Sequence, residues 1–130
     1  MTKHTPCEHK SRRYRCRICN ITGFIKWKAA KTIARHVKRY KASKTLGNKT
    51  ITNIGCTAGE FKAHMEAQFT GRMSWNNYGT LWDVDHIIPV QYKANGNKPT
   101  FDTVLRRLHY TNTQPMLKAE NRRKGNRWIG

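Results

Sequence analysis

Three of the four cysteines in this 130-residue chain lie within thirteen residues near the N-terminus. They form two short ligand pairs, Cys7-Glu-His9 and Cys16-Arg-Ile-Cys19. Three thiolates and one imidazole at such spacings can surround one ion, and this closed set is typical of structural zinc. His4 competes with His9 for the fourth position, because the spacing from His4 to Cys7 repeats that of the second pair. The sequence therefore predicts a zinc-stapled segment with no open coordination position for catalysis.

Disulfides are the alternative use of these cysteines. The first residues contain no apolar segment of the kind found in secretory signals, so we expect reduced thiols and an intracellular protein, in the cytoplasm of a host cell. Cys56 stands far from the cluster and is expected to be a small buried hydrophobic residue.

The charge of the chain is strongly positive and uneven. There are 26 Lys and Arg residues against 7 Asp and Glu, a net charge of +19. Residues 1–59 carry 15 basic residues and one acidic residue, whereas residues 60–130 carry 11 and 6. No apolar run is long enough to span a membrane. Such an excess favours a polyanionic partner, and we expect nucleic acid rather than a merely solubilising basic surface.

A basic helix is predicted over residues 24–43, since Ile25, Ala29, Ile33 and Val37 recur at helical spacing. Residues 46–50 then form a turn or linker. Candidate DNA contacts in this half of the chain are Arg12, Arg13, Arg15, Lys28, Lys31, Arg35, Lys38 and Arg39.

A second helix is expected after Thr57, because Thr57 and Glu60 fit a capping box, and Gly71 is expected to end it. His64, on the apolar face of this helix, is expected to be packed rather than to bind a metal. An aromatic loop over residues 74–79 leads into a strand-like run at residues 81–84, and residues 95–97 and 102–108 predict a turn and a short helix.

Three segments of the back half carry residues suited to catalysis: residues 82–89, 109–116 and 119–126. In the first, Asp85 provides a hard oxygen ligand beside His86, a base that titrates near neutrality. A short helix carrying Asn121 could return its amide oxygen towards Asp85, leaving most of a Mg²⁺ shell to water and phosphate.

Together these segments resemble the HNH nucleases, which have the ββα-metal fold of two strands and a helix around one divalent ion. His86 matches the first histidine of the motif, Asn112 the central asparagine and Asn121 the last position. The resemblance covers about residues 54–127 and is to enzymes of phages and other mobile elements, homing endonucleases among them. It implies an α+β fold: a small ββα-metal core with helices, preceded by the zinc module and the basic helix.

The resemblance also implies the roles of the residues. His86 would be the general base that activates water, and Asp85 and Asn121 would hold Mg²⁺ or Mn²⁺. Asn112 would tie down the loop and help to orient His86. Phosphate contacts near the site would come from Arg122, Arg123 and Lys124. Asparagine at position 121, where some members have histidine, favours the hard ions, and His109 is a spare candidate for the site.

We therefore expect three parts: a zinc-binding module at 1–23, a basic DNA-binding helix and linker at 24–49, and a nuclease domain at 50–130. The expected function is metal-dependent hydrolysis of double-stranded DNA by a monomer or weak homodimer. The alternatives are a zinc-dependent nucleic-acid-binding protein without catalysis, and a nuclease that resolves branched DNA junctions.

Overall fold

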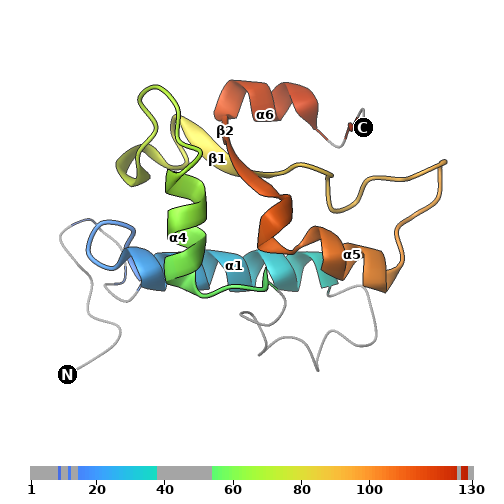
Figure 1. Ribbon diagram of the computed structural model, residues 1–130, viewed down its shortest axis with the longest axis horizontal. Helices are drawn as coiled ribbons and strands as arrows, with labels where there is room; N and C mark the ends of the chain where they lie inside the picture. Colours follow the sequence, from blue (N-terminus) through green and yellow to red (C-terminus); the bar gives the residue numbers. More distant parts are fainter. Residues whose placement is uncertain (1–8, 10–11, 13–14, 38–53, 126, 129–130) are drawn as a thin grey trace.

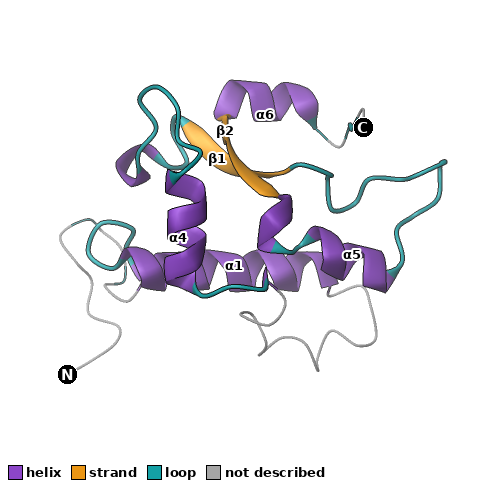
Figure 2. Ribbon diagram, viewed as in Figure 1, coloured by secondary structure: helices purple, strands orange, loops and turns teal. Residues whose placement is uncertain are grey.

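The computed structural model describes residues 9, 12, 15–37, 54–125 and 127–128 (Figures 1 and 2). Its helices and strands are, in chain order, α1 (Ile21–Val37), α4 (Ala58–Glu66), β1 (Trp82–His86), α5 (Phe101–Arg107), β2 (Thr113–Leu117) and α6 (Lys118–Lys124). Two short 3₁₀ turns, η2 (Trp75–Asn77) and η3 (Tyr110–Asn112), precede the strands. The expected α+β class is thus confirmed, while the identity of this core with an HNH nuclease and the three domain boundaries stay predictions.

The two strands form one antiparallel sheet. Trp82 lies opposite Leu117 at one end of the sheet, and His86 lies opposite Thr113 at the other. Helix α6 follows β2 without a loop and lies beside the two-stranded sheet (Figure 2). The Lys118 ammonium, in its first turn, donates to the Gly79 carbonyl at 2.6 Å, which fixes the start of α6 beside the entry to β1.

Helix α1 begins at Ile21, three residues before the predicted start. Its beginning is set by Asn20, whose side-chain oxygen accepts from the Gly23 backbone N–H at 3.1 Å and so satisfies a free donor of the first turn. The predicted apolar stripe is confirmed for Ile25, Ile33 and Val37, all buried. The rest of the predicted helix and the linker at residues 46–50 lie outside the described residues.

The capping box of α4 is confirmed. The Glu60 N–H donates to Thr57 Oγ1 at 3.1 Å, and the Thr57 N–H donates to Glu60 Oε1 at 2.8 Å. The expectation that Gly71 ends this helix is wrong, because α4 ends at Glu66. The chain turns earlier to place Phe69 against Trp82, with ring centroids 5.0 Å apart, and Gly71 then takes a left-handed turn with φ 56°.

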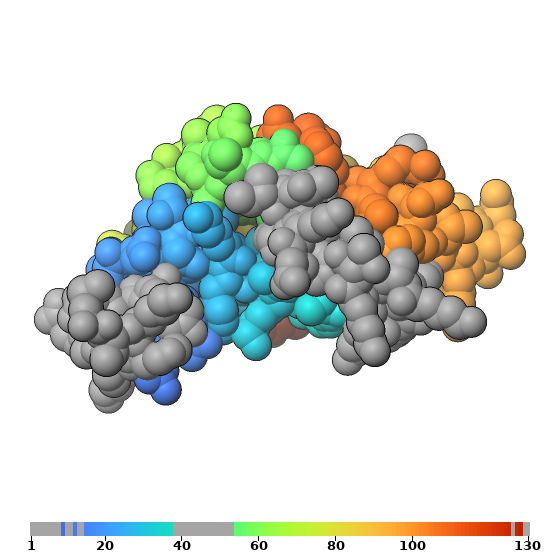
Figure 3. Space-filling model, turned by 90° about the horizontal axis from the view of Figure 1, so that it is seen from below, coloured from blue at the N-terminus to red at the C-terminus, as the bar shows by residue number. Residues whose placement is uncertain are grey.

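Two hydrophobic clusters hold the elements together. The α5 cluster consists of Ile33, Val37, Ile54, Cys56, Val90, Val104 and Leu108. The aromatic cluster is centred on Met65, Tyr78 and Trp82, with Phe24 of α1 packed against it. Helix α1 therefore contributes to both clusters, and its surface runs along one face of the molecule beside α4 (Figure 3). The burial of Cys56 in the first cluster is as predicted.

The long connection from β1 to β2 contains both elements predicted for it. Asn95 and Gly96 form a tight turn with φ of 54° and 79°, and α5 occupies residues 101–107. None of the helices in the described part of the chain is both long and apolar enough to cross a membrane.

Candidate functional site

A sulfur and nitrogen cluster lies directly before α1. The donor atoms of His9, Cys16 and Cys19 all lie within 4.8 Å of one another. His9 Nδ1 is 3.6 Å from the sulfur of Cys16 and 3.3 Å from that of Cys19. These three residues could hold a metal ion, and their chemistry fits a structural zinc. Cys7 and the rival ligand His4 lie outside the described residues.

The turn from Cys16 to Cys19 resembles the short turns that carry two metal-binding cysteines, and we call it the knuckle. The backbone N–H of Cys19 points at the sulfur of Cys16 at 3.5 Å, so the turn between them directs both thiols to one side. Arg17, within the turn, donates to the Asn76 carbonyl at 3.2 Å. The knuckle is thereby fastened to the aromatic loop, 59 residues further along the chain.

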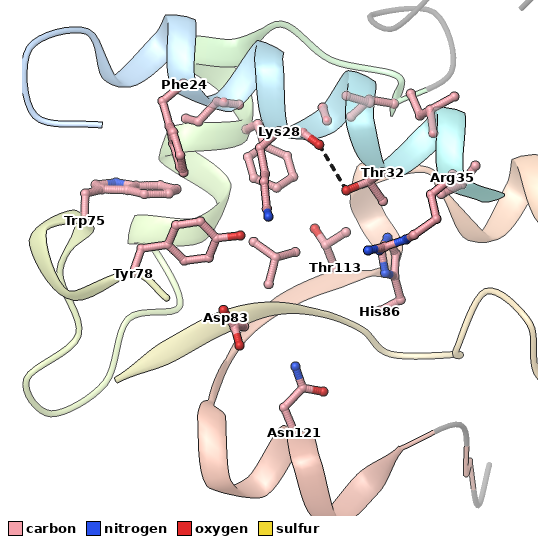
Figure 4. A pocket seen from close by; sticks show the side chains of 17 residues that line it. Phe24, Lys28, Thr32, Arg35, Trp75, Tyr78, Asp83, His86, Thr113 and Asn121 are labelled. Atoms are coloured by element: carbon pink, nitrogen blue, oxygen red, sulfur yellow. Dashed lines mark hydrogen bonds between the residues drawn. The ribbon is translucent and has the colours of Figure 1, made fainter. Parts of the chain in front are cut away.

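A cleft of about 340 Å³ lies between α1 and the two-stranded sheet. Figure 4 shows Lys28 and Arg35 entering it from α1, His86 from the end of β1, and Asn121 from α6. The structure therefore brings His86 and Asn121, 35 positions apart in sequence, to one cleft. Arg35, exposed on α1, lies beside the His86 ring in this view.

His86 is held in its neutral form. Burial lowers the pKa of His86 to about 4, against the opposing effect of the Asp85 carboxylate, and the charges of Arg35 and Lys124 lower it further. The ring of His36 from α1 meets that of His86 edge to face at 6.4 Å. A neutral imidazole keeps a lone pair that can accept a proton.

The carboxylate of Asp85 is already paired. Asp85 is only 5% exposed, and its Oδ2 accepts from the Lys124 ammonium at 2.8 Å and from the Gln114 amide at 2.9 Å. The same ammonium donates to the carbonyls of His86 at 2.8 Å and Ile87 at 2.9 Å. Lys124, predicted to contact phosphate, thus has three oxygen partners inside the protein.

Asn112 fixes the exit from β1. Its side-chain oxygen accepts from the Ile88 N–H at 2.9 Å, and its amide group donates to the carbonyls of Ile88 at 2.9 Å and Arg107 at 2.8 Å. It thereby ties the long loop to the start of β2. A direct effect of Asn112 on the orientation of His86 stays a prediction.

Two ionisable residues of the cleft are not predicted from the sequence. Asp83 lies in the cleft near Asn121 (Figure 4), although the sequence predicts only Asp85 as a carboxylate of the site. Tyr78 directs its hydroxyl into the cleft, and burial together with the charge of Asp83 raises the pKa of Tyr78 to about 12. No sequence signal marks either residue, because alternation along β1 groups Asp83 with Asp85, and Asp85 does not line the cleft.

The predicted DNA-binding residues fall into separate groups. Lys28 and Arg35 line the cleft, whereas Arg15 and Lys31 lie over the Trp27 ring at 4.6 and 5.3 Å. Three further members are exposed, namely Arg12 near the knuckle and Arg122 and Arg123 on α6, whereas Lys124 turns inward to Asp85. Arg13, Lys38 and Arg39 lie outside the described residues.

Two further histidines lie away from the cleft. His64 is packed as predicted, with Nε2 3.0 Å from the Thr113 carbonyl oxygen and its ring edge to face with Tyr110 at 5.1 Å. His109 Nδ1 is 2.9 Å from Thr111 Oγ1, and its ring lies against Gly55, where an added Cβ would come within 2.0 Å of it. Neither side chain lines the cleft.

Comparison with known proteins yields two viral relatives. An uncharacterised protein of Acanthamoeba polyphaga mimivirus is 36% identical over 52 residues, which are 38% of this chain and 23% of that protein. Another uncharacterised protein of the same virus is 31% identical over 88 residues, 63% of this chain and 35% of that protein. The chain thus spans about a quarter to about a third of the length of these curated relatives. No family model and no solved structure matches the chain.

Proposed function

We propose that the chain is a metal-dependent DNA endonuclease of the HNH type. The observation that carries the proposal is the unit formed by β1, β2 and α6, in which His86 ends the first strand and shares a cleft with Asn121 of the helix. Strand, strand and helix follow in the order that the ββα-metal resemblance requires, and Asp85 lies next to His86.

The reaction is hydrolysis of a phosphodiester bond. His86, neutral in this environment, accepts a proton from a water molecule as the water oxygen attacks the phosphorus. The bond from phosphorus to the 3′ oxygen breaks, and the leaving oxygen takes a proton from solvent. The products are a 5′ phosphate and a 3′ hydroxyl. Arg35, beside His86 in the same cleft, binds the negative phosphate, and Lys28 adds positive charge to the cleft.

The chemistry of Asp85 and Asn121 suits one hard divalent ion, Mg²⁺ or Mn²⁺. When bound, such an ion would neutralise charge that develops on the phosphate. For Asp85 to bind it, the Lys124 ammonium has to leave the carboxylate. His9, Cys16 and Cys19 would hold the separate structural zinc.

The partner we propose is double-stranded DNA, bound by Arg12 near the knuckle and by the exposed basic residues of α1 and α6. We propose a monomer or weak homodimer that acts inside a host cell, and the mimivirus relatives support a viral source. A binding protein without catalysis is the second candidate. It is favoured by the pairing of Asp85 with Lys124, which neutralises the carboxylate that an ion would need.

Cleavage of supercoiled plasmid tests the two candidates. The full chain should nick or linearise the plasmid with Mg²⁺ or Mn²⁺ and leave it intact with EDTA. His86→Ala should lower the cleavage rate by about 10²–10⁴-fold, the usual contribution of a general base, while DNA affinity is kept. His109→Gln is the matched control, since this histidine lies outside the cleft, and should cut at the normal rate.

Absence of cleavage with either ion on linear, supercoiled and branched DNA, combined with normal binding, would establish the binding-only candidate. Faster cutting of a four-way junction than of duplex would identify the junction-resolving alternative. Normal cleavage by folded His86→Ala protein would show that another group is the base.

A further inference from the structure

The two ends of the cleft differ in chemistry. Phe24, Trp75 and Tyr78 line one end with aromatic rings, and His86 and Arg35 line the other (Figure 4). The Phe24 ring meets that of Tyr78 edge to face at 5.4 Å, so this end is a firm aromatic wall. A ligand that fits both ends has a flat apolar part and an anionic part.

Two cations of α1 point into the cleft. Lys28 and Arg35 are seven residues apart, which places them on one face of the helix about 10 Å apart. In the described part of the chain, the side chain of neither residue makes a hydrogen bond or an ion pair, whereas the Lys124 ammonium has three oxygen partners. The free ammonium of Lys28 and guanidinium of Arg35 are therefore available to an anionic ligand.

The size of the cleft limits what can enter it. About 340 Å³ is at the lower end of the range of about 300–1,000 Å³ for small-molecule sites. Helix α1 closes one side and β1 the other, and the His36 ring packs on that of His86. A base-paired double helix is too wide for this space, but a single nucleotide fits it.

We propose that the cleft binds one unpaired nucleotide of a DNA strand, with its base against Phe24 and Trp75 and its phosphate at Arg35 and His86. Only the statement that this phosphate is the one cleaved rests on the proposed function. Stacking of one base on an aromatic side chain strengthens binding by about tenfold, and unpairing is easiest where the DNA is mismatched or single-stranded. DNA with an unpaired stretch is therefore the preferred ligand over fully paired DNA of the same length.

Fluorescence anisotropy without added Mg²⁺ or Mn²⁺, which prevents cleavage and leaves bound zinc in place, measures this preference in the full chain. The probes are a labelled paired duplex, the same duplex with a central mismatched bubble, and the labelled strand alone. The bubble should bind about tenfold more tightly than the paired duplex, as expected for one stacked base. Equal affinities for bubble and duplex would overturn the proposal.

Substitutions on α1 test each end of the cleft. Phe24→Leu keeps an apolar side chain but removes the ring, so it should abolish most of the bubble preference and leave duplex affinity unchanged. Lys28→Gln should weaken bubble binding more than duplex binding. Its matched control is Lys26→Gln, which removes the same charge from an exposed position outside the cleft and should weaken both equally.

Thermal melting shows whether Phe24→Leu folds; if it does not, the comparison of Lys28→Gln with Lys26→Gln decides alone. Identical effects of these two lysine substitutions would contradict binding in the cleft. A bubble preference without cleavage by any ion would refute the proposed function and leave this inference standing. Cleavage of plasmid without any bubble preference would support the proposed function and refute binding of an unpaired nucleotide in the cleft.

Discussion

The two candidate ion sites of this molecule differ in how their charge is balanced. The site before α1 gathers two thiols and an imidazole within 4.8 Å of one another. The site at the end of β1 centres on the Asp85 carboxylate, which the protein itself neutralises with Lys124 at 2.8 Å. The donors also differ, because sulfur and nitrogen suit zinc whereas carboxylate and amide oxygens suit Mg²⁺ or Mn²⁺.

Under the proposed function, this difference would separate a zinc ion that stabilises the fold from a divalent ion that takes part in cleavage. Thiolates brought together repel each other until a cation joins them, so binding of zinc at this cluster would be coupled to the folding of the knuckle. At the second candidate site, which we call the oxygen site and which consists of Asp85 and Asn121, the Lys124 ammonium already balances the charge of the carboxylate. An ion that enters it competes with Lys124 and adds little to the stability of the fold.

The largest expected effect is at the sulfur site. Cys16→Ser should remove bound zinc and unfold the knuckle, because zinc binding at such sites is worth on the order of 10 kcal/mol. Atomic emission and thermal melting measure both results. Cys56→Ala, which alters a buried thiol outside the cluster, is the control and should keep its zinc. Unchanged zinc content in Cys16→Ser would refute the zinc site.

Removal of the internal cation tests the oxygen site. Lys124→Met leaves Asp85 buried without its partner and should cost about 4 kcal/mol of the free energy of unfolding. Millimolar Mg²⁺ or Mn²⁺ should restore part of this loss, since the ion can now replace the ammonium. Lys118→Met, on the same helix but bonded to the Gly79 carbonyl, is the matched control and should show no such recovery. An equal gain of stability with metal in both variants would contradict binding of the ion at Asp85.

The loop that frames the oxygen site depends on Asn112. Asn112→Ala deprives the Ile88 N–H and the Ile88 and Arg107 carbonyls of their partner, at an expected cost of about 3 kcal/mol. Denaturant unfolding should show the same loss with and without divalent ions, because the side chain belongs to the scaffold. Asn97→Ala, at an exposed turn, should change stability little. A loss that disappears with Mg²⁺ would make Asn112 part of the ion site instead.

The smallest effect concerns the charge of His86. Its pKa is about 4 in the folded chain against an ordinary value near 6.5, so the unfolded chain binds the proton more readily. Stability is therefore complete above pH 6.5 and falls as the pH drops towards 4, by about 1–2 kcal/mol for a side chain that is not fully buried. Melting between pH 7 and pH 4 should show this slope, and His86→Gln should reduce it. An identical slope in the variant would mean that other groups cause it.

Elements governed by neighbouring residues could be predicted from the sequence. Thr57 and Glu60 are three residues apart, and their capping box formed as expected. The turn at Asn95–Gly96 and helix α5 depend equally on local preferences. The approach of His9 to Cys16 and Cys19 followed from ligand spacing.

Features that depend on distant packing could not be predicted. Lys124 and Asp85 are 39 residues apart, and nothing in the local sequence shows that this lysine turns inward. The early end of α4 depends on contact between Phe69 and Trp82 across the aromatic cluster. Asp83 and Tyr78 are cleft residues because α1 lies across the cleft from β1, and this arrangement depends on packing between distant segments.

Helix α1 begins two residues after Cys19 and carries Lys28 and Arg35 into the cleft. One rigid element therefore joins the predicted zinc site to the proposed nucleotide site. If DNA binding requires α1 in this position, the two ligands are thermodynamically linked: the factor by which zinc raises the affinity for DNA equals the factor by which DNA raises the affinity for zinc. At equilibrium, a higher concentration of chelator should then be needed to remove zinc from the DNA complex than from the free protein.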